Sequence, residues 1–415
     1  MPTRVFLALL VTLSGALSAT AMAQPAATGA PGTIRIGVLN DMSGPFADLS
    51  GRGSVVAAQM AADDFARDAG PNAPRVEILG ADHQNKADVG TAIVRRWVDQ
   101  DGVAAVVDVP NSAVALAANG VLRDKDRAFL ASSTATSDLT GKFCAPTTVQ
   151  WTFDTWALAN GTARALVAQG GTTWFFLAAD YAFGQALERD ASALVQQAGG
   201  RVLGDARAPL DTSDFSAYLL QAQSSGANVI ALANAGTDTT NAIKQAHEFG
   251  IGQDGKQRLA GLLVFLTDVD ALGLPVAQGL VLTEAFYWDL NAQTRAWSQR
   301  FATRMGGRMP TMNHAGVYSS VLAYLRAAQA VGVPPGGVPS GSAVVARMEA
   351  SPIEDPLFGP VTVRRDGRAV HAMYLFQVKA PAESRGRWDD YTLLATIPAD
   401  EAFRPMADGG CPLVK

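Results

Sequence analysis

The chain has 415 residues, 48% of them hydrophobic and 17% charged, and carries a formal net charge of −5 at pH 7. This composition fits a folded protein with large buried surfaces and excludes a disordered chain, and the length suffices for two domains. The sequence contains no basic stripe with interleaved aromatic residues, so we expect no nucleic-acid partner.

The N-terminus has the features of a secretory signal peptide. Arg4 precedes an apolar run over 5–17, and small residues lead to an A-x-A site that ends at Ala23. We therefore predict residues 1–23 as a signal peptide, cleavage after Ala23 and a periplasmic protein. A buried N-terminal helix is the alternative, but Pro25 and the glycines that follow would break it. No later segment offers about 18 uninterrupted apolar residues, so we expect a soluble mature protein.

Short apolar strands then alternate with helical patterns. We predict strands over 34–39, 76–79, 103–107 and 128–131, and helices over 54–65, 89–100 and from 112 onward. Such alternation is typical of a parallel sheet that is covered by helices on both faces.

The same cadence restarts further along the chain, which predicts a second sheet and therefore two lobes. Here the expected strands are 174–178, 202–204 and 229–233, and the expected helices are 183–197, 214–224 and 239–249. A strand near 280 and helices over 294–305 and 317–330 follow. The last predicted element is a hairpin of 361–363 and 372–378, with Asp366 and Gly367 in its turn.

The chain has two cysteines, Cys144 and Cys411. In an oxidising compartment such a pair predicts a disulfide, which would tie the C-terminal tail to the folded body. Two separate buried thiols are the alternative.

Several short motifs occur in a recognisable order. They are Ile36-Gly37-Val38-Leu39 with Ser43-Gly44-Pro45-Phe46, the stretch 129–136 with Leu139-Thr140, Asp180-Tyr181-Ala182-Phe183-Gly184, Lys244-Gln245-Ala246 with Phe249-Gly250, and Phe358-Gly359-Pro360 ahead of Asp366-Gly367-Arg368. With these motifs the chain resembles the branched-chain amino-acid type of periplasmic binding proteins, the leucine/isoleucine/valine-binding family of ABC importers. The resemblance runs over nearly the whole mature chain.

The resemblance implies a type I periplasmic-binding-protein fold of two α/β lobes, each a mainly parallel sheet flanked by helices. Three chain crossings are expected, near Trp151, Thr283 and Phe358. Lobe 1 would then comprise 33–151 and 283–357, lobe 2 would comprise 152–282 and 358–402, and 403–415 would form a tail. The family also implies capture of a small carboxylated solute, ligand-induced closure and a membrane permease as partner. We expect a monomer.

In lobe 1 the resemblance assigns ligand contact to the loop Thr134, Ala135 and Thr136, through a backbone carbonyl, a backbone N–H and the last hydroxyl. Asn111 and Ser112 lie between a predicted strand and a predicted helix, where Ser112 is a good N-cap. Helix N-termini also attract anions, so we expect a ligand carboxylate between Ser112 and Thr136. An ordinary polar loop and a simple cap are the alternatives.

Aromatic side chains are expected to cover the apolar part of the ligand. Phe46 follows the first predicted strand, and Tyr181 and Phe183 occupy aromatic positions of a family motif, with Phe183 replacing the common tyrosine. Tyr287 lies in an aromatic segment, 284–289, that resembles a subgroup associated with aromatic or other carboxylated ligands. Packing inside the core is the alternative for Phe183, and packing of the hinge is the alternative for Tyr287.

The ligand's amine is the open question. Amino-acid binders of the family place an acidic residue of lobe 2 against it, because a buried cation needs a partner. Asp238 and Asp268 are the candidates, and helix capping is the alternative for Asp238. The site at Gly236 also lacks an aromatic residue that amino-acid binders often carry there. Two ligand classes therefore remain: a branched-chain or related amino acid, and an amine-free carboxylate, aromatic ones included.

Two other classes of protein are less consistent with the sequence. No two of the four histidines are spaced as a metal pair, the glycines form no phosphate-binding loop, and Ser133 lacks a nucleophile elbow. We therefore expect no catalysis, no metal and no cofactor. A periplasmic sensor would bind ligand in the same way, but sensors are often fused to a transmembrane segment, so transport is preferred.

Overall fold

The computed structural model describes the chain except for residues 2–31, 71–72, 253–254 and 335–336. The signal peptide expected over 1–23, with its cleavage after Ala23, therefore lies outside the described residues apart from Met1. Within the described part, no helix combines the length and the apolar character needed to cross a bilayer. The fold below concerns the compact unit that extends to Lys415.

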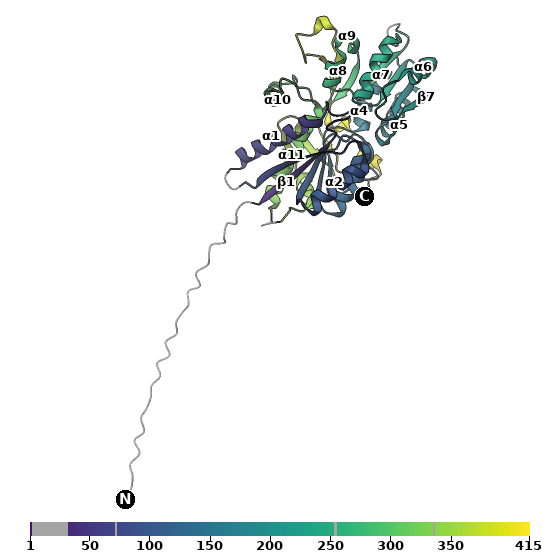
Figure 1. Cartoon of the computed structure of the whole chain (residues 1–415). Coiled ribbons are helices and arrows are strands. Elements are labelled where there is room, and N and C mark those ends of the chain that lie inside the picture. The colour runs from purple at the N-terminus through teal and green to yellow at the C-terminus, as the bar shows by residue number, and fades with distance from the viewer. Residues whose placement is uncertain (2–31, 71–72, 253–254, 335–336) are drawn as a thin grey trace. The chain divides into compact units, whose positions relative to one another are not determined.

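Lobe one is built on a five-stranded parallel sheet with the order β2-β1-β3-β4-β5. Its strands are β1 (Thr33–Asn40), β2 (Arg75–Asp82), β3 (Val103–Asp108), β4 (Ala128–Ala131) and β5 (Thr148–Gln150). One face is covered by α1 (Gly51–Ala69) and α11 (Met312–Val331), the other by α2 (Ala87–Asp99) and α3 (Ser112–Asp124) (Figure 1). Because helices cover both faces, β3 and β4 are buried at every position.

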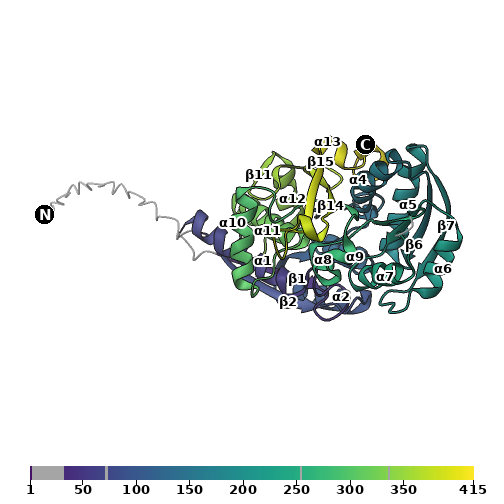
Figure 2. The same ribbon diagram turned by 90° about the horizontal axis from the view of Figure 1, so that it is seen from above.

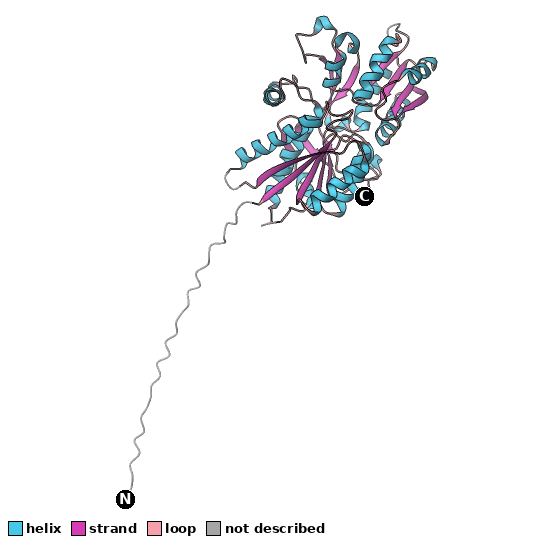
Figure 3. Cartoon of the chain, viewed as in Figure 1, coloured by secondary structure: helices cyan, strands magenta, loops and turns pink. Residues whose placement is uncertain are grey.

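Lobe two repeats this plan with a four-stranded parallel sheet of order β7-β6-β8-β9. Its strands are β6 (Thr173–Ala179), β7 (Arg201–Ala208), β8 (Val229–Ala233) and β9 (Arg258–Gly261). The helices are α4 (Thr155–Ala168), α5 (Ala182–Gln197), α6 (Ser216–Ser224), α7 (Thr237–Glu248), α8 (Leu266–Leu272) and α9 (Leu274–Ala277). Figure 3 shows the helices arranged around the strands of both sheets. The predicted two-lobed α/β architecture is confirmed.

The last third of the chain adds elements to both lobes. An antiparallel sheet of order β10-β14-β15 joins β10 (Val281–Glu284), β14 (Met373–Val378) and β15 (Tyr391–Ile397), and it lies between the two groups of helices in Figure 2. A second small sheet contains β11 (Ile353–Asp355), β12 (Gly359–Val363) and β13 (Ala369–Val370). The remaining helices are α10 (Ala292–Arg304), α12 (Gly341–Glu349) and α13 (Ala399–Ala402).

The predicted C-terminal hairpin is correct in its turn and wrong in its second strand. The chain does reverse at Gly367, which has a φ of 82°, and Val363 pairs with Ala369. The strand expected at 372–378 is β14, which pairs instead with β10 and β15. A short apolar pattern predicts a strand but not the strand with which it pairs. Here the chain returns to lobe two before β14, so β14 pairs with strands there.

The chain passes between the lobes three times: between β5 and α4, between β10 and α10, and between β13 and β14. The first two crossings lie close to the positions expected at Trp151 and Thr283. The third lies later than the position expected at Phe358, because β12 contacts α12 and pairs with β13. Gln150 of β5 forms a parallel bridge with Arg368, so the chain leaves lobe one only near His371.

Cys144 and Cys411 form a disulfide, with their Cα atoms 5.6 Å apart. The bond joins the loop before β5 to the C-terminal tail, across 267 residues of sequence. Other links also hold the tail: the Arg404 guanidinium donates to the Ser137 carbonyl at 3.0 Å, and the Arg404 carbonyl accepts from Arg364 at 2.9 Å. The disulfide adds a covalent link to these contacts.

Replacing Cys144 and Cys411 together by serine should lower the free energy of unfolding by about 2–4 kcal/mol, because the unfolded chain regains the conformational freedom that a long closed loop removes. Urea unfolding of the oxidised protein and of the double variant measures this difference. Reduced wild-type protein is the matched control and should unfold like the variant. Equal stability of oxidised and reduced wild type would contradict the prediction.

Candidate functional site

A small cavity lies between the lobes, at the carboxyl ends of the strands of both sheets. Lobe one lines it with residues that follow β1, β3 and β4 and with one residue of α11: Phe46, Leu49, Pro110, Ser133, Ala135 and Asn313. Lobe two lines it with residues that follow β6, β8 and β9: Tyr181, Phe183, Ala235, Leu263 and Phe265. This is the edge at which open α/β sheets bind ligands. We call it the interlobe cavity.

The two lobes touch directly beside the interlobe cavity. The Thr237 N–H of lobe two donates a hydrogen bond of 3.3 Å to the Pro45 carbonyl of lobe one. The neighbouring Gly236 has a φ of 62°, and a Cβ atom there would overlap the same carbonyl and press on the Phe46 ring. Glycine is therefore required at this contact for both its conformation and its size. The lobes are therefore in direct contact at this place.

Strained backbone shapes the lobe-one wall. Asp108 and Val109, at the end of β3, both have positive φ, at 85° and 58°. A β-branched residue in this region is uncommon and costs energy, and such strain is concentrated at functional sites. The conformation is held in place because Thr134 donates its hydroxyl to the Val109 carbonyl at 2.6 Å. The ends of β3 and β4 are thereby locked together at the cavity.

Asp108 lies behind this wall and is fully buried. Its carboxyl accepts hydrogen bonds from the Ser133 hydroxyl and, at 3.0 Å, from the Asn40 side chain. Burial raises the pKa of Asp108 to about 6. Ser133 itself lines the cavity, so Asp108 orients a hydroxyl that a ligand can contact.

The structure brings Ser112 and Thr136 together, as expected, but buries both of them behind the cavity wall. The Thr136 N–H donates to the Ser112 hydroxyl at 3.3 Å. The N-cap of α3 is Asn111 and not Ser112, because the Asn111 side chain accepts from the N–H groups of Ala113 and Val114. These two donors are therefore already used, which leaves the helix N-terminus with less to offer a ligand anion.

The loop after β4 has bonded carbonyls and unbonded N–H groups beside the cavity. The Thr134 carbonyl accepts from the Gln150 side chain at 2.8 Å, and the Ala135 carbonyl accepts from the Thr155 N–H at 2.7 Å. The N–H groups of Thr134 and Ala135, by contrast, donate to no group in the described part of the chain. Two adjacent unpaired N–H groups beside a cavity are suited to bind an anionic oxygen.

The lobe-two wall is aromatic and apolar. The rings of Tyr181 and Phe183 lie 5.9 Å apart and line the cavity together, as expected from their motif. The Tyr181 hydroxyl makes no hydrogen bond with the residues that the structure describes, and burial together with the charge of Asp238 raises its pKa. Leu263 and Phe265, which follow β9, complete this wall.

Neither candidate acid of lobe two lines the cavity. Asp238 accepts from the N–H groups of Asp211 and Thr212, both at 3.1 Å, and so holds the loop after β7. Asp268 accepts from the Phe265 N–H at 2.9 Å at the start of α8. Burial raises the pKa of each carboxyl to about 7. Both acids therefore bond to the local backbone. The helix cap left open for Asp238 is not observed, because Asp238 bonds to the loop after β7 and the N-cap of α7 is Gly236.

Tyr287 also lies outside the cavity lining. Its ring packs against Phe376 and Tyr391, with centroids 5.5 and 5.0 Å away, and its hydroxyl donates to the Trp388 carbonyl at 2.8 Å. The residue therefore supports the second crossing, which corresponds to the hinge packing considered from the sequence.

The sequence did not single out several lining residues: Leu49, Pro110, Ala235, Leu263, Phe265 and Asn313. Pro110 and Ala235 adjoin residues that were identified, so their position in the chain was a usable signal. Leu49, Leu263 and Phe265 have no such signal, because an apolar residue that faces a cavity and one in the core follow the same sequence pattern. Asn313 is one polar residue at the start of a long helix.

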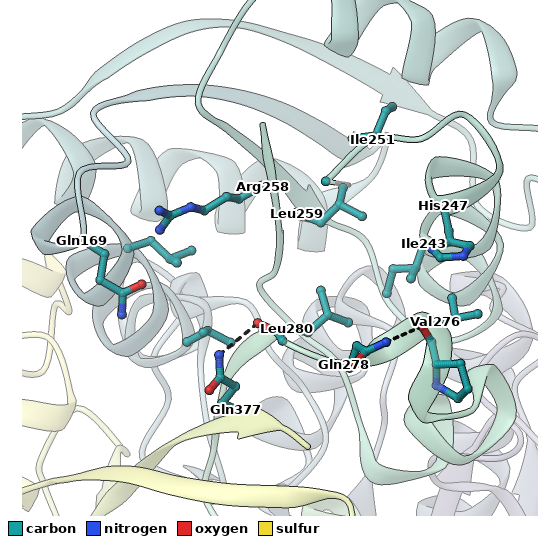
Figure 4. A pocket seen from close by; sticks show the side chains of 15 residues that line it. Gln169, Ile243, His247, Ile251, Arg258, Leu259, Val276, Gln278, Leu280 and Gln377 are labelled. Carbon is teal, nitrogen blue, oxygen red and sulfur yellow. Dashed lines mark hydrogen bonds between the residues drawn. The ribbon is translucent and has the colours of Figure 1, made fainter. Parts of the chain in front are cut away.

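A larger pocket lies within lobe two and shares no lining residue with the interlobe cavity. Ile243 and His247 of α7 border it on one side, and Arg258 and Leu259 of β9 border it on another (Figure 4). Gln278 donates to the Pro275 carbonyl at 3.0 Å within its rim. It opens between β9 and β10 and is remote from the strand ends that face lobe one.

Comparison with known proteins connects this geometry to one family. The family model described as periplasmic binding protein matches residues 33–386. Leu/Ile/Val-binding protein homolog 6 of Brucella melitensis is 28% identical over 261 residues, which cover 62% of this chain and 66% of that protein. The match thus spans slightly less than two thirds of this curated relative.

Two solved structures are similar over more of the chain. A periplasmic binding protein of Burkholderia mallei is 45% identical, with a TM-score of 0.87 over 92% of this chain and 99% of its own. A branched chain amino acid ABC transporter periplasmic ligand-binding protein of Burkholderia xenovorans is 36% identical, with a TM-score of 0.80 over 92% of this chain and 100% of its own. The resemblance found in the motifs is confirmed by these matches.

Gly236→Ala should hold the lobes apart, because the added methyl group overlaps the Pro45 carbonyl. We expect a larger radius of gyration than that of the wild type in small-angle scattering. Gly226→Ala is the matched control: Gly226 has a similar φ of 66°, but a Cβ there meets no atom within 4 Å. Identical scattering by all three proteins would contradict a functional contact at Gly236.

Asp108→Asn should change how stability depends on pH. The carboxyl has a folded pKa of about 6, above its unfolded value near 3.9, so the folded state binds the proton more tightly. Its contribution to stability is therefore full at low pH and declines as the pH rises from about 4 to about 6, by up to about 3 kcal/mol. Urea unfolding at pH 4.5 and at pH 7.5 should show that the wild type loses stability relative to the variant when the pH is raised between these values. Parallel pH profiles would contradict the assignment.

Proposed function

Because this chain belongs to the periplasmic binding protein family, we propose that it captures a small amine-free carboxylate between its lobes and presents it to the membrane permease of an ABC importer. Members of this family bind solutes, and membership implies a periplasmic location. The observation that carries the ligand class is the lobe-two wall, which contains no charged side chain. We expect the protein to release the solute unchanged.

An ammonium group would be poorly served in this cavity. A buried cation needs an acidic partner, and removing one member of a buried ion pair typically costs several kcal/mol. The lining residues include no carboxylate from either lobe. Asp238 and Asp268 are bonded to backbone N–H groups elsewhere, and Asp108 lies behind Ser133. The cavity therefore favours a ligand without an amine.

A carboxylate, in contrast, has suitable donors. The unpaired N–H groups of Thr134 and Ala135 are fixed in place, because their carbonyls are bonded to Gln150 and Thr155. Hydrogen bonds to a charged oxygen are the stronger kind. The rings of Phe46, Phe183 and Phe265 then enclose the apolar body of the ligand, whether it is aromatic or branched.

The names of the relatives support a different ligand. A Brucella protein named as a Leu/Ile/Val-binding homolog and a Burkholderia protein named for branched-chain amino acids both resemble this chain. A branched-chain amino acid is therefore the second candidate. The two candidates differ by a single amine, which makes them easy to separate by experiment.

Transport would depend on lobe closure. The hydrogen bond between Thr237 and Pro45 forms only when the lobes meet, and a ligand that contacts both walls stabilises that state. The closed face is then the form that the permease recognises. A sensor role would use the same closure with another membrane partner.

A thermal-shift screen of matched pairs separates the two candidates. Leucine is compared with 4-methylpentanoate, and phenylalanine with 3-phenylpropanoate. We expect the acids to raise the melting temperature and their amino-acid counterparts to have little effect, because only a ligand that binds the folded state stabilises it. A larger shift with leucine or phenylalanine would overturn the proposal in favour of the amino acid.

Leu263→Glu tests the wall itself. The variant adds a carboxylate to the cavity, so affinity for the acids should fall at least about tenfold through like-charge repulsion, while binding of the amino acids improves. Leu263→Gln is the control, since glutamine has nearly the same shape as glutamate but carries no charge. Equal effects of the two substitutions in calorimetric titrations would show that charge at this wall does not select the ligand.

A further inference from the structure

Asn313 is a buried amide without a partner inside the interlobe cavity. It is the second residue of α11, is fully buried, and lines the cavity with Phe46, Ser133 and Tyr181. Neither its Nδ2 nor its Oδ1 atom forms a hydrogen bond with any residue that the structure describes. More than nine in ten buried polar groups in proteins are paired, so an amide with both ends free calls for an explanation.

The backbone at Asn313 is fixed beside the cavity. The Thr311 hydroxyl donates to the Leu49 carbonyl at 2.8 Å, and the His314 ring contacts the Ser50 carbonyl at 2.9 Å. His314 also accepts from the Thr311 N–H at 3.0 Å. The first turn of α11 is thus fastened to the loop after β1 on both sides of Asn313. The backbone that carries the amide is therefore fixed at the cavity, and no residue in the described part of the chain satisfies the amide.

We propose that Asn313 is a specificity-determining residue that binds a hydroxyl group on the body of the ligand. This inference rests on the proposed function, because it concerns the same cavity and adds a second polar anchor to the carboxylate. A hydroxyl both donates and accepts, so it satisfies Oδ1 and Nδ2 of the amide together. A second carboxylate would satisfy Nδ2 and be repelled by Oδ1, and an ammonium would satisfy Oδ1 alone. The ligand class is therefore a hydroxylated, amine-free carboxylic acid.

The alternative occupant is water. The hydroxyls of Ser132 and Thr152 are also unpaired, and Thr152 packs against Gly316 one turn further along α11. Ordered water in this region would satisfy such groups without selecting a ligand. Unlike Asn313, however, neither Ser132 nor Thr152 lines the cavity. A ligand that fills the cavity meets the amide first.

The experiment compares 3-phenylpropanoate with its hydroxylated forms, which carry the hydroxyl on carbon 2 or 3 or on the ring, by calorimetric titration. The wild type should bind at least one hydroxylated acid about tenfold or more tightly than the parent acid. Asn313→Leu, which keeps the size of the side chain and removes its polar atoms, should abolish that preference and bind the parent acid as well as or better than the wild type does.

Asn313→Ser is the second variant and keeps the experiment informative if the leucine variant fails to fold. The serine hydroxyl still provides a donor and an acceptor, so this variant should retain part of the preference for the hydroxylated acid. An unchanged preference in either folded variant would mean that water alone occupies the amide and would overturn the inference. Failure of every hydroxylated acid to outbind the parent would do the same. If none of the acids binds while leucine or phenylalanine does, the proposed function itself fails, which is a distinguishable result.

Discussion

Buried hydrogen bonds between the first and third chain crossings fix where the two lobes meet. The Gln150 N–H donates to the Gly367 carbonyl at 2.8 Å, the His371 ring contacts the Trp151 carbonyl at 3.0 Å, and the Arg368 guanidinium donates to the Phe153 carbonyl at 2.9 Å. Arg368 is fully buried, lies 3.6 Å from Asp154 and stacks over the Phe403 ring, so a carboxylate and an aromatic face both stabilise its charge. Burial also lowers the pKa of His371 to about 4, which keeps the ring neutral.

The same bonds determine the polarity of the ligand cavity. Gln150 and Thr155, which flank the first crossing, donate hydrogen bonds to the carbonyls of Thr134 and Ala135. The N–H groups of this loop are consequently left for the cavity. Lobe two contributes no acid to balance them, and its buried carboxyls are bonded to backbone instead. Unbonded N–H groups of lobe one therefore face an apolar wall of lobe two. This combination depends on the residues at the hinge as well as on those that line the cavity.

The sequence predicted most strands of the two parallel sheets because fully buried strands are continuous apolar runs; β4 and β8 occur at the predicted residues. The short edge strands β5 and β9 were not predicted. The sequence also did not predict the partner of β14 or the late third crossing, since both depend on where the chain returns in space. In the cavity, the loop motifs identified Phe46, Ala135, Tyr181 and Phe183. Leu263 carries no local signal, because its pattern is that of a core residue.

The two acids of lobe two show why one sequence position can support two functions. A short acidic residue after a strand is suited both to bind an ammonium group and to accept from backbone N–H groups at a helix start, since each role places a carboxylate at the same edge of the sheet. Only the direction of the side chain separates the roles, and that direction is set by neighbours such as the Phe265 N–H. Because Asp268 holds the start of α8 and Asp238 holds the loop after β7, ligand selection is free to change at wall residues such as Leu263 and Asn313 without altering the sheets that carry them.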